Sequence, residues 1–412
     1  MHLEYLKAPW VDECYSYYGV WHDNFSEFYD SMLTGINFSP PLYFLFNFFL
    51  QLIFPTSIEQ LRIQSLVFII IGIVLSFLTA RKIFGIHAAF FAIILVASQS
   101  SLLLSQAQEA RHYAMFFACG TWVLFMQNLD ARTIKKNKWI IFFAHFCLCQ
   151  VHYLGIIFSG LSGTLYFLTS KKKGLWERIP MPIALCWIVS FLLYLVYLNK
   201  QKSILNTWPK PNGTSDLLLG YNDSILILSA LIPILIFILI DEPNRDTKAY
   251  SIEETHCSRP IVITSLAWLL VPLLFWILSQ LTSLNLFVDR YFIPKESALI
   301  LLVAYGFNLI FQKLPKNKSM SIPILVTFLL SIVVILLSTK RAAFGLNKNT
   351  NYHHSLIIEE SNSMSNLPIT LEGDPKYFPN AYLNRNKYQF KIPNDSLREL
   401  YKEFSKNLIL VE

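Results

Sequence analysis

Long, uninterrupted apolar runs separated by short polar segments dominate the pattern along this chain. The runs approach the roughly 20 residues that a helix needs to cross the hydrocarbon core of a bilayer. Apolar and polar positions do not alternate as they do in barrel strands, so the pattern predicts helices. The chain is therefore expected to be an all-α polytopic membrane protein with about ten spans, at 61–83, 86–104, 112–129, 139–151, 153–170, 181–199, 222–241, 261–283, 292–311 and 321–339.

The Lys and Arg residues predict the orientation of these spans. Their main clusters all fall on the same side of the membrane only if 139–170 crosses it twice. One long bent helix over that stretch is the alternative. Positive residues favour the cytoplasmic side, so these clusters are expected inside, at Arg81 and Lys82, at Arg132, Lys135, Lys136 and Lys138, at Lys171, Lys172, Lys173 and Arg178, and at Lys313, Lys316 and Lys318. A smaller set contradicts this orientation, namely Lys200, Lys202, Lys210, Lys340 and Arg341.

The same orientation predicts which segments lie outside. The outer segments are residues 1–60, the turns at 105–111, 152, 200–221 and 284–291, and the tail from 340 onward. The apolar stretch 40–54 is short, and counting it as a span would invert every loop charge. We therefore expect it to form an interfacial or re-entrant helix.

The last part of the chain has a different character. It is polar from Asn347 to Glu412, with β-prone pieces at Pro368–Leu371 and Leu408–Val411 and a helical pattern at Leu397–Phe404. This predicts a small extracytoplasmic α/β appendage. Three regions are expected: an outer loop with the interfacial helix (1–60), a transmembrane bundle (61–340) and the C-terminal domain (341–412).

Composition agrees with this class of protein. The chain is 54% hydrophobic and 15% charged, far from an ordinary soluble domain. The net charge of +7 comes largely from short loops that set topology, so we expect no nucleic-acid partner. The six cysteines show no spacing typical of a metal site or a disulfide framework, and apolar runs hold several of them.

Two adjacent carboxylates, Asp12 and Glu13, lie in the predicted first outer loop. One carboxylate at such a position can act as general base toward an acceptor hydroxyl while its neighbour orients it or binds a cation. Adjacent acids in a solvated loop are the alternative.

A second polar cluster, Gln106 to Tyr113, stands at the outer end of the second and third spans. An arginine at this depth is costly unless it is paired or hydrated, and the fork of Arg111 suits a phosphate. Snorkelling of Arg111 to lipid headgroups, or its neutralisation by Glu109, is the alternative. His112 completes the cluster.

Two further outer turns carry candidate residues. His152 marks the turn between two spans, where a histidine either satisfies local hydrogen bonds or lines a site. Arg290 and Tyr291 open the ninth span, and Arg290 either binds a second anionic oxygen or pairs with Asp289 as a boundary anchor. Charged residues that share one membrane face indicate a site.

These residues resemble motifs of the GT-C class of membrane glycosyltransferases. The similarity is greatest to bacterial members related to the protein O-mannosyltransferases (family 39), the aminoarabinose transferase of lipid A and lipid A galacturonosyltransferases. The matching motifs are Asp12-Glu13, Ser39-Pro40-Pro41-Leu42-Tyr43 with Leu61-Arg62, Ser105 to Ala114, and Arg290-Tyr291 with Pro294. The resemblance covers roughly residues 8–340 in layout.

The resemblance implies an enzyme that transfers a hexosyl or pentosyl group from a polyprenyl-phosphate carrier to a glycan, lipid or protein acceptor. It places this reaction at the outer face of the cytoplasmic (inner) membrane, usually with inversion. By resemblance Asp12 is the general base with Glu13 as its partner, and Arg111, Arg290 and Tyr291 bind the donor phosphate. The pocket is expected to be lined by Glu109, His112, Tyr113 and His152.

The chain departs from the family pattern in two places. The family has a transmembrane helix before the acidic pair, so the resemblance predicts that a first helix is missing here. The aminoarabinose branch has an aspartate where Tyr113 stands, so no metal site and no cofactor are predicted, while a divalent cation is left open.

Three alternative functions stay open. An O-antigen ligase or polymerase usually depends on a large outer loop rich in Arg and His, whereas the 200–221 loop is small. A transporter of polyprenyl-linked glycans is expected to carry polar residues and broken helices at mid-membrane. An inactive truncated homologue would have the fold without the chemistry.

Overall fold

The structure is a computed structural model. It describes residues 11–20, 22, 24–34, 39–54, 57–129, 136, 138–169, 180–200, 213–214, 217, 221, 252–282, 287–313, 369–372 and 388–391. The spans predicted at 222–241 and 321–339, the helix at Leu397–Phe404 and the strand at Leu408–Val411 lie outside these residues.

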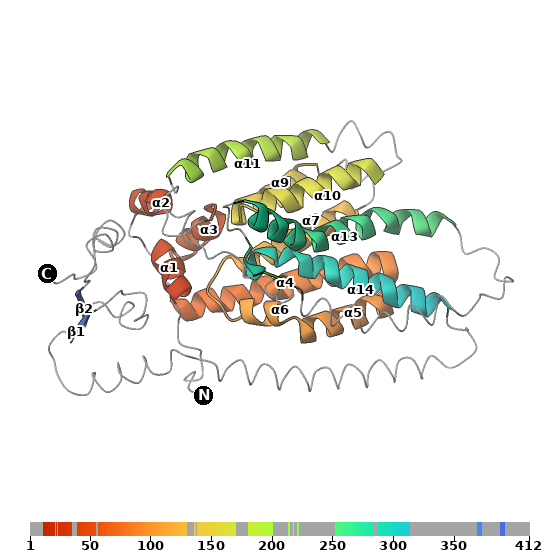
Figure 1. Ribbon diagram of the computed structural model, residues 1–412, viewed down its shortest axis with the longest axis horizontal. Coiled ribbons are helices and arrows are strands. Elements are labelled where there is room, and N and C mark those ends of the chain that lie inside the picture. Colours follow the sequence, from red (N-terminus) through yellow and green to blue (C-terminus); the bar gives the residue numbers. More distant parts are fainter. Residues whose placement is uncertain are drawn as a thin grey trace.

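Long helices lie alongside one another as a bundle (Figure 1). Each predicted span within the described part of the chain corresponds to a helix, which confirms the helical prediction there. The elements are α4 (Ile58–Phe84), α5 (Ile86–Gln99), α6 (Ser101–Gln106), α7 (Tyr113–Gln127), α9 (Lys138–Val151), α10 (Gly155–Thr169), α11 (Pro180–Lys200), α13 (Ile252–Leu281) and α14 (Pro294–Lys313). In the bundle α4 packs against α7, α5 and α14, while α9 packs against α7, α11 and α10.

Three of these helices have segments long and apolar enough to cross a membrane: Ile58–Phe84, Met181–Leu198 and Pro260–Leu281. Their surfaces carry exposed apolar side chains, such as Ile70 on α4 and Leu192 on α11. Large exposed apolar patches are unfavourable in water and are the expected outer surface of helices in lipid.

Local residues explain where α4 begins and ends. Ser57 caps its first turn, because its hydroxyl accepts a hydrogen bond from the Gln60 amide at 3.1 Å. Gly85 ends it with φ at 89°, a left-handed conformation that favours glycine.

The predicted single span at 86–104 is wrong in one respect, because the helix breaks at Ser100. The Ser100 hydroxyl accepts from the Leu103 amide at 3.1 Å and so starts α6 as a separate helix. A capping serine inside an apolar run leaves the hydrophobic pattern unchanged, and the pattern therefore missed it.

The stretch 139–170 forms two helices, as the loop charges required, with a turn at 152–154 between α9 and α10. Gly155 opens α10 against the backbone of α9. A Cβ atom at this position would lie 2.0 Å from the Leu148 carbonyl oxygen, far inside van der Waals contact.

We expect the substitution Gly155→Ala to destabilise the protein by at least about 1–3 kcal/mol, since the added methyl group forces backbone apart from backbone. Comparison of denaturant-unfolding midpoints with the wild type checks this. Gly160→Ala is the matched control on the same helix, because no atom lies within 4 Å of a Cβ built there. Equal stability of the two variants would contradict the close approach of α9 and α10.

The described residues before α4 are mostly helical, whereas a loop with one interfacial helix was expected for residues 1–60. They include α1 (Val11–Val20), α2 (Phe25–Thr34) and α3 (Leu42–Leu50), all at one end of the bundle in Figure 1. The acidic pair therefore lies in the first turn of α1. Helix α3 has nine residues, too few to cross a bilayer, as expected of the 40–54 stretch.

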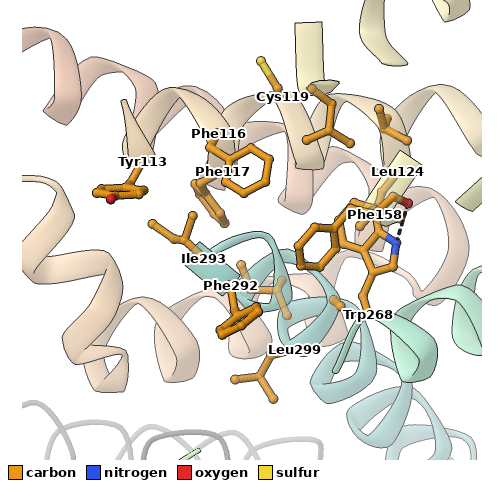
Figure 2. Packing of buried hydrophobic residues seen from close by; sticks show 14 of the residues in the cluster. Tyr113, Phe116, Phe117, Cys119, Leu124, Phe158, Trp268, Phe292, Ile293 and Leu299 are labelled. Carbon is orange, nitrogen blue, oxygen red and sulfur yellow. Dashed lines mark hydrogen bonds between the residues drawn. The ribbon is translucent and has the colours of Figure 1, made fainter. Parts of the chain in front are cut away.

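The core of the bundle is aromatic and closely packed (Figure 2). The Trp268 indole of α13 is fully buried and donates a hydrogen bond to the Phe158 carbonyl of α10 at 3.1 Å. Helices α4 and α7 approach closely at Gly72, where a Cβ atom would lie 2.4 Å from the Phe117 ring. Small residues at helix contacts are typical of membrane bundles.

The C-terminal tail contributes two short strands, β1 (Ile369–Glu372) and β2 (Tyr388–Lys391), that pair in parallel. Strand β1 coincides with the predicted strand at Pro368–Leu371. The division of the chain into three regions, with an α/β appendage at the end, stays a prediction.

Candidate functional site at one end of the bundle

A buried ion pair fixes α1 to the bundle. The Arg62 guanidinium, in the second turn of α4, donates to both carboxylate oxygens of Glu13, from Nε at 2.8 Å and from Nη2 at 2.7 Å. Glu13 also accepts a hydrogen bond from the Ala110 amide at 2.8 Å. Glu13 is fully buried and Arg62 is 6% exposed, so this is a desolvated bidentate pair of the strong kind.

Further hydrogen bonds hold the turn that precedes α7. Ser16, one helical turn after Glu13, accepts a hydrogen bond from Nη1 of Arg111 at 3.2 Å. The Ser65 hydroxyl of α4 donates a hydrogen bond to the Arg111 carbonyl at 3.4 Å. Helix α1, the start of α4 and the Arg111 turn therefore form one connected unit.

Asp12 directly precedes Glu13 in α1, and its side chain is outside the described part of the structure. Glu13 anchors α1 to the bundle, because both of its carboxylate oxygens accept hydrogen bonds, from Arg62 and from the Ala110 amide. The catalytic roles expected of Asp12 and Glu13 stay predictions.

Two arginines from distant parts of the chain meet at the ring of Tyr113. The guanidinium carbons of Arg111 and Arg290 each lie 5.7 Å from the centre of this ring, so they are no more than twice that distance apart. Arg290 lies in the short 3-10 helix η3 (Asp289–Phe292) that leads into α14. Each contact is a cation–π interaction, and together they bring two positive charges to the same aromatic ring.

Stacked rings continue from this point. The His152 ring, in the turn between α9 and α10, lies 4.8 Å from Tyr291, 5.4 Å from His112 and 4.9 Å from Phe116, measured between ring centres. Tyr113 and Tyr291 also stack, at 5.9 Å. Three segments distant in sequence thus meet here: the Arg111 turn with the start of α7, the α9–α10 turn and η3.

The protonation state of His152 follows from its surroundings. Burial, reinforced by the charges of Arg111 and Arg290, lowers its pKa to about 3, so the ring is neutral at physiological pH. Its Nδ1 atom accepts a hydrogen bond from the Leu154 amide at 3.1 Å. The proton of the neutral ring therefore resides on Nε2, which can donate.

The remaining predicted pocket residues, Glu109 and His112, lie in the turn that precedes α7. Glu109 is buried and accepts a hydrogen bond from the Gln106 amide group at 3.0 Å. The His112 ring is also buried and lies 4.2 Å from the Tyr113 ring. Burial, assisted by Arg111, lowers the pKa of His112 well below its ordinary value.

The structure thus brings together the predicted residues whose side chains it describes: Glu13, Glu109, Arg111, His112, Tyr113, His152, Arg290 and Tyr291. Sequence reasoning gave no role to Arg62, Ser16 or Tyr43, although motifs quoted for the resemblance contain Arg62 and Tyr43. A signal for Arg62 was available, because an arginine near the start of a long apolar helix requires a partner.

Metal ligands are not gathered in the part of the chain that the structure describes, where no group of three or more His, Cys, Asp or Glu side chains is placed to hold an ion. The described arrangement instead offers guanidinium groups, imidazoles and phenols. Such groups bind anions and hydroxyls.

Apolar helices with a polar end that holds Arg62, Arg111 and Arg290 make up the described part of this chain, and its fold is of the GT-C type. The fold is similar to that of ArnT from Cupriavidus metallidurans, in crystal structures bound to undecaprenyl phosphate and in the apo state. Each comparison gives a TM-score of 0.60 and 13% sequence identity, over 99% of this chain and 86% of that chain. No family model and no curated protein matches the sequence.

This likeness confirms the fold class that the motifs implied. The finer relationship, to the family 39 and mannosyltransferase-like members, stays a prediction, as do the membrane in which the protein resides and the side on which the site opens.

Proposed function

We propose that the protein is a glycosyltransferase that moves a sugar from a polyprenyl-phosphate donor to an acceptor outside the cytoplasmic membrane. The observation that carries this is the meeting of Arg111 and Arg290 at Tyr113. Arg111 is buried and Arg290 is partly buried; two like charges repel each other, and a phosphate bound by both guanidinium groups would offset that repulsion. The fold adds support, since ArnT with the same fold is known bound to undecaprenyl phosphate.

The proposed chemistry is a single displacement. The acceptor hydroxyl oxygen attacks the anomeric carbon, the bond from that carbon to the phosphate oxygen breaks, and polyprenyl phosphate leaves with the electron pair. Asp12 takes the proton of the attacking hydroxyl. Arg111 and Arg290 hold the negative charge of the phosphate, and the Nε2–H of His152 provides a further donor. One displacement inverts the anomeric configuration.

In this proposal Glu13 and Arg62 are positioning residues. Their ion pair, with the Ala110 amide, fixes α1 against the turn that carries Arg111. It therefore sets the distance between the base on α1 and the phosphate-binding arginine. Positioning of this kind is a large part of what an enzyme contributes when the leaving group is already good.

The test is release of polyprenyl phosphate when the purified full chain is given polyprenyl-phosphate sugars and a panel of lipid, glycan and protein acceptors. We expect release with an active donor and acceptor pair, and Asp12→Asn is expected to lower the turnover by about 10²–10⁴-fold because the general base is lost. Asp30→Asn, at an exposed position of α2, is the matched control.

Full turnover by Asp12→Asn would contradict the assignment of the base. Movement of intact polyprenyl-linked sugar across a vesicle membrane without release would favour the transporter. Release of polyprenyl diphosphate from a long glycan donor would favour a ligase or polymerase.

A further inference from the structure

Two buried polar side chains beside the arginines have unused hydrogen-bonding groups. Tyr43 is fully buried and His112 is 3% exposed. The Tyr43 hydroxyl and both ring nitrogens of His112 have no hydrogen-bond partner among the described residues. The large majority of buried polar atoms in native proteins are hydrogen-bonded, so such exceptions require an explanation.

The two side chains are neighbours. Tyr43 comes from the first turn of α3 and His112 precedes α7, and their rings meet edge to face with centres 6.2 Å apart. The His112 ring also stacks on His152, with ring centres 5.4 Å apart. The unused hydrogen-bonding groups of Tyr43 and His112 therefore lie in one cluster of neighbouring rings.

This cluster adjoins the proposed phosphate site. His112 follows Arg111 in the chain, and its ring lies 4.2 Å from Tyr113, the ring over which both guanidinium groups lie. In a polyprenyl-phosphate sugar a single oxygen joins the anomeric carbon to the phosphorus. A donor whose phosphate lies at Arg111 and Arg290 consequently places its sugar ring within reach of Tyr43 and His112.

The chemistry of the two groups selects a partner. A phenol and a neutral imidazole each offer a donor and an acceptor, which is what a hydroxyl group requires. Burial keeps both uncharged, because it raises the pKa of Tyr43 above its ordinary value and lowers that of His112. An ammonium group would instead meet the repulsion of two nearby guanidinium charges.

We propose that Tyr43 and His112 bind the hydroxyl groups of the donor sugar, so that the enzyme prefers a neutral sugar to an amino sugar. This rests on the proposed function and specifies its substrate. Both groups are covered in the present structure, so binding requires their side chains to part. The neighbouring His152 would orient the same ring.

The experiment uses the full-length wild type and Tyr43→Phe, with a polyprenyl-phosphate hexose, its deoxy analogues and the corresponding amino sugar. Release of polyprenyl phosphate gives kcat and KM for each donor. We expect Tyr43→Phe to lower kcat/KM for the neutral hexose by at least about tenfold, the value of one hydrogen bond. The variant should become indifferent to one deoxy substitution that impairs the wild type. His112→Gln is expected to do the same for a different hydroxyl.

Binding of sugar-free polyprenyl phosphate separates folding from recognition and should be the same in the wild type and Tyr43→Phe. The matched control is Tyr29→Phe, at an exposed position of α2. Unchanged sensitivity of both variants to every deoxy analogue would overturn the proposal, as would equal use of the amino sugar by the wild type. These results leave the glycosyltransferase intact, whereas absence of release from every donor removes the proposed function and this inference together.

Discussion

Replacing Arg62 by methionine is expected to destabilise the folded protein by about 3–5 kcal/mol, because it leaves the carboxylate of Glu13 buried without its charge partner. The pair is bidentate and shielded from water, so solvent does not offset the loss as it does at a surface. Chemical unfolding of the purified protein, compared with Arg81→Met at an exposed position of the same helix, measures the effect.

The double substitution Glu13→Gln with Arg62→Met distinguishes a buried charge from lost packing. It removes both charges and keeps an amide oxygen that can accept the hydrogen bond of the Ala110 amide. We expect it to recover most of the stability that Arg62→Met loses, since replacing both members of a buried pair is often nearly neutral. A double variant less stable than Arg62→Met would contradict this account.

Catalysis is expected to respond differently from stability. The double variant loses the rigid fork that fixes α1 against the Arg111 turn, so we expect a folded protein with reduced kcat and little change in donor binding. This separation of kcat from KM is what a positioning role predicts and what a role in stability alone does not.

Hydrophobic runs and loop charges were sufficient to predict most of the described bundle. They identified α4, α7, α9, α10, α11, α13 and α14, because a membrane span must be apolar over its whole length. The charges also resolved 139–170 into two helices. They placed the turns that carry Arg111, His152 and Arg290 on one side, and the structure brings these three residues together.

Contacts between distant residues could not be predicted in the same way. Glu13 and Arg62 are 49 positions apart, and Glu13 and Ala110 are 97 positions apart. No periodicity in the sequence relates such positions, so the sequence indicated a catalytic pair at Asp12 and Glu13 but not the contacts of Glu13 with Arg62 and Ala110. Tyr43 lies in an apolar run, where the pattern does not reveal that its hydroxyl is buried and unused.

Substituting Arg111 or Arg290 is expected to lower activity strongly. Each of Arg111→Gln and Arg290→Gln removes one preorganised charged donor to the phosphate, and we expect a loss of about 10²–10³-fold in kcat/KM from each. Since both guanidinium groups contact the Tyr113 ring, the two substitutions should not be additive, and a double-mutant cycle measures their coupling.

Ligand binding to the resting protein provides a readout that does not depend on turnover. Sugar-free polyprenyl phosphate should raise the melting temperature of the wild type, because a ligand that binds only the folded state stabilises it. The increase should be largely lost in Arg290→Gln and kept in Arg81→Gln, whose exposed side chain lies on α4. Uncharged polyprenol should raise the melting temperature much less, since the arginines recognise the phosphate. An equal increase with polyprenol, or with Arg290→Gln, would show that the chain binds the lipid tail and that the two arginines have another purpose.

Substitutions of Tyr113 test whether its ring positions Arg111 and Arg290. Tyr113→Phe keeps the ring over which both guanidinium groups lie, and phosphate binding is expected to remain near that of the wild type. Tyr113→Leu removes the aromatic face and with it two cation–π contacts, each contributing about 0.5–2 kcal/mol. We therefore expect Tyr113→Leu to weaken binding of polyprenyl phosphate by about tenfold or more while Tyr113→Phe does not. Equal loss in both variants would place the phosphate contact on the phenol hydroxyl, and equal retention would show that the arginines are held by other contacts.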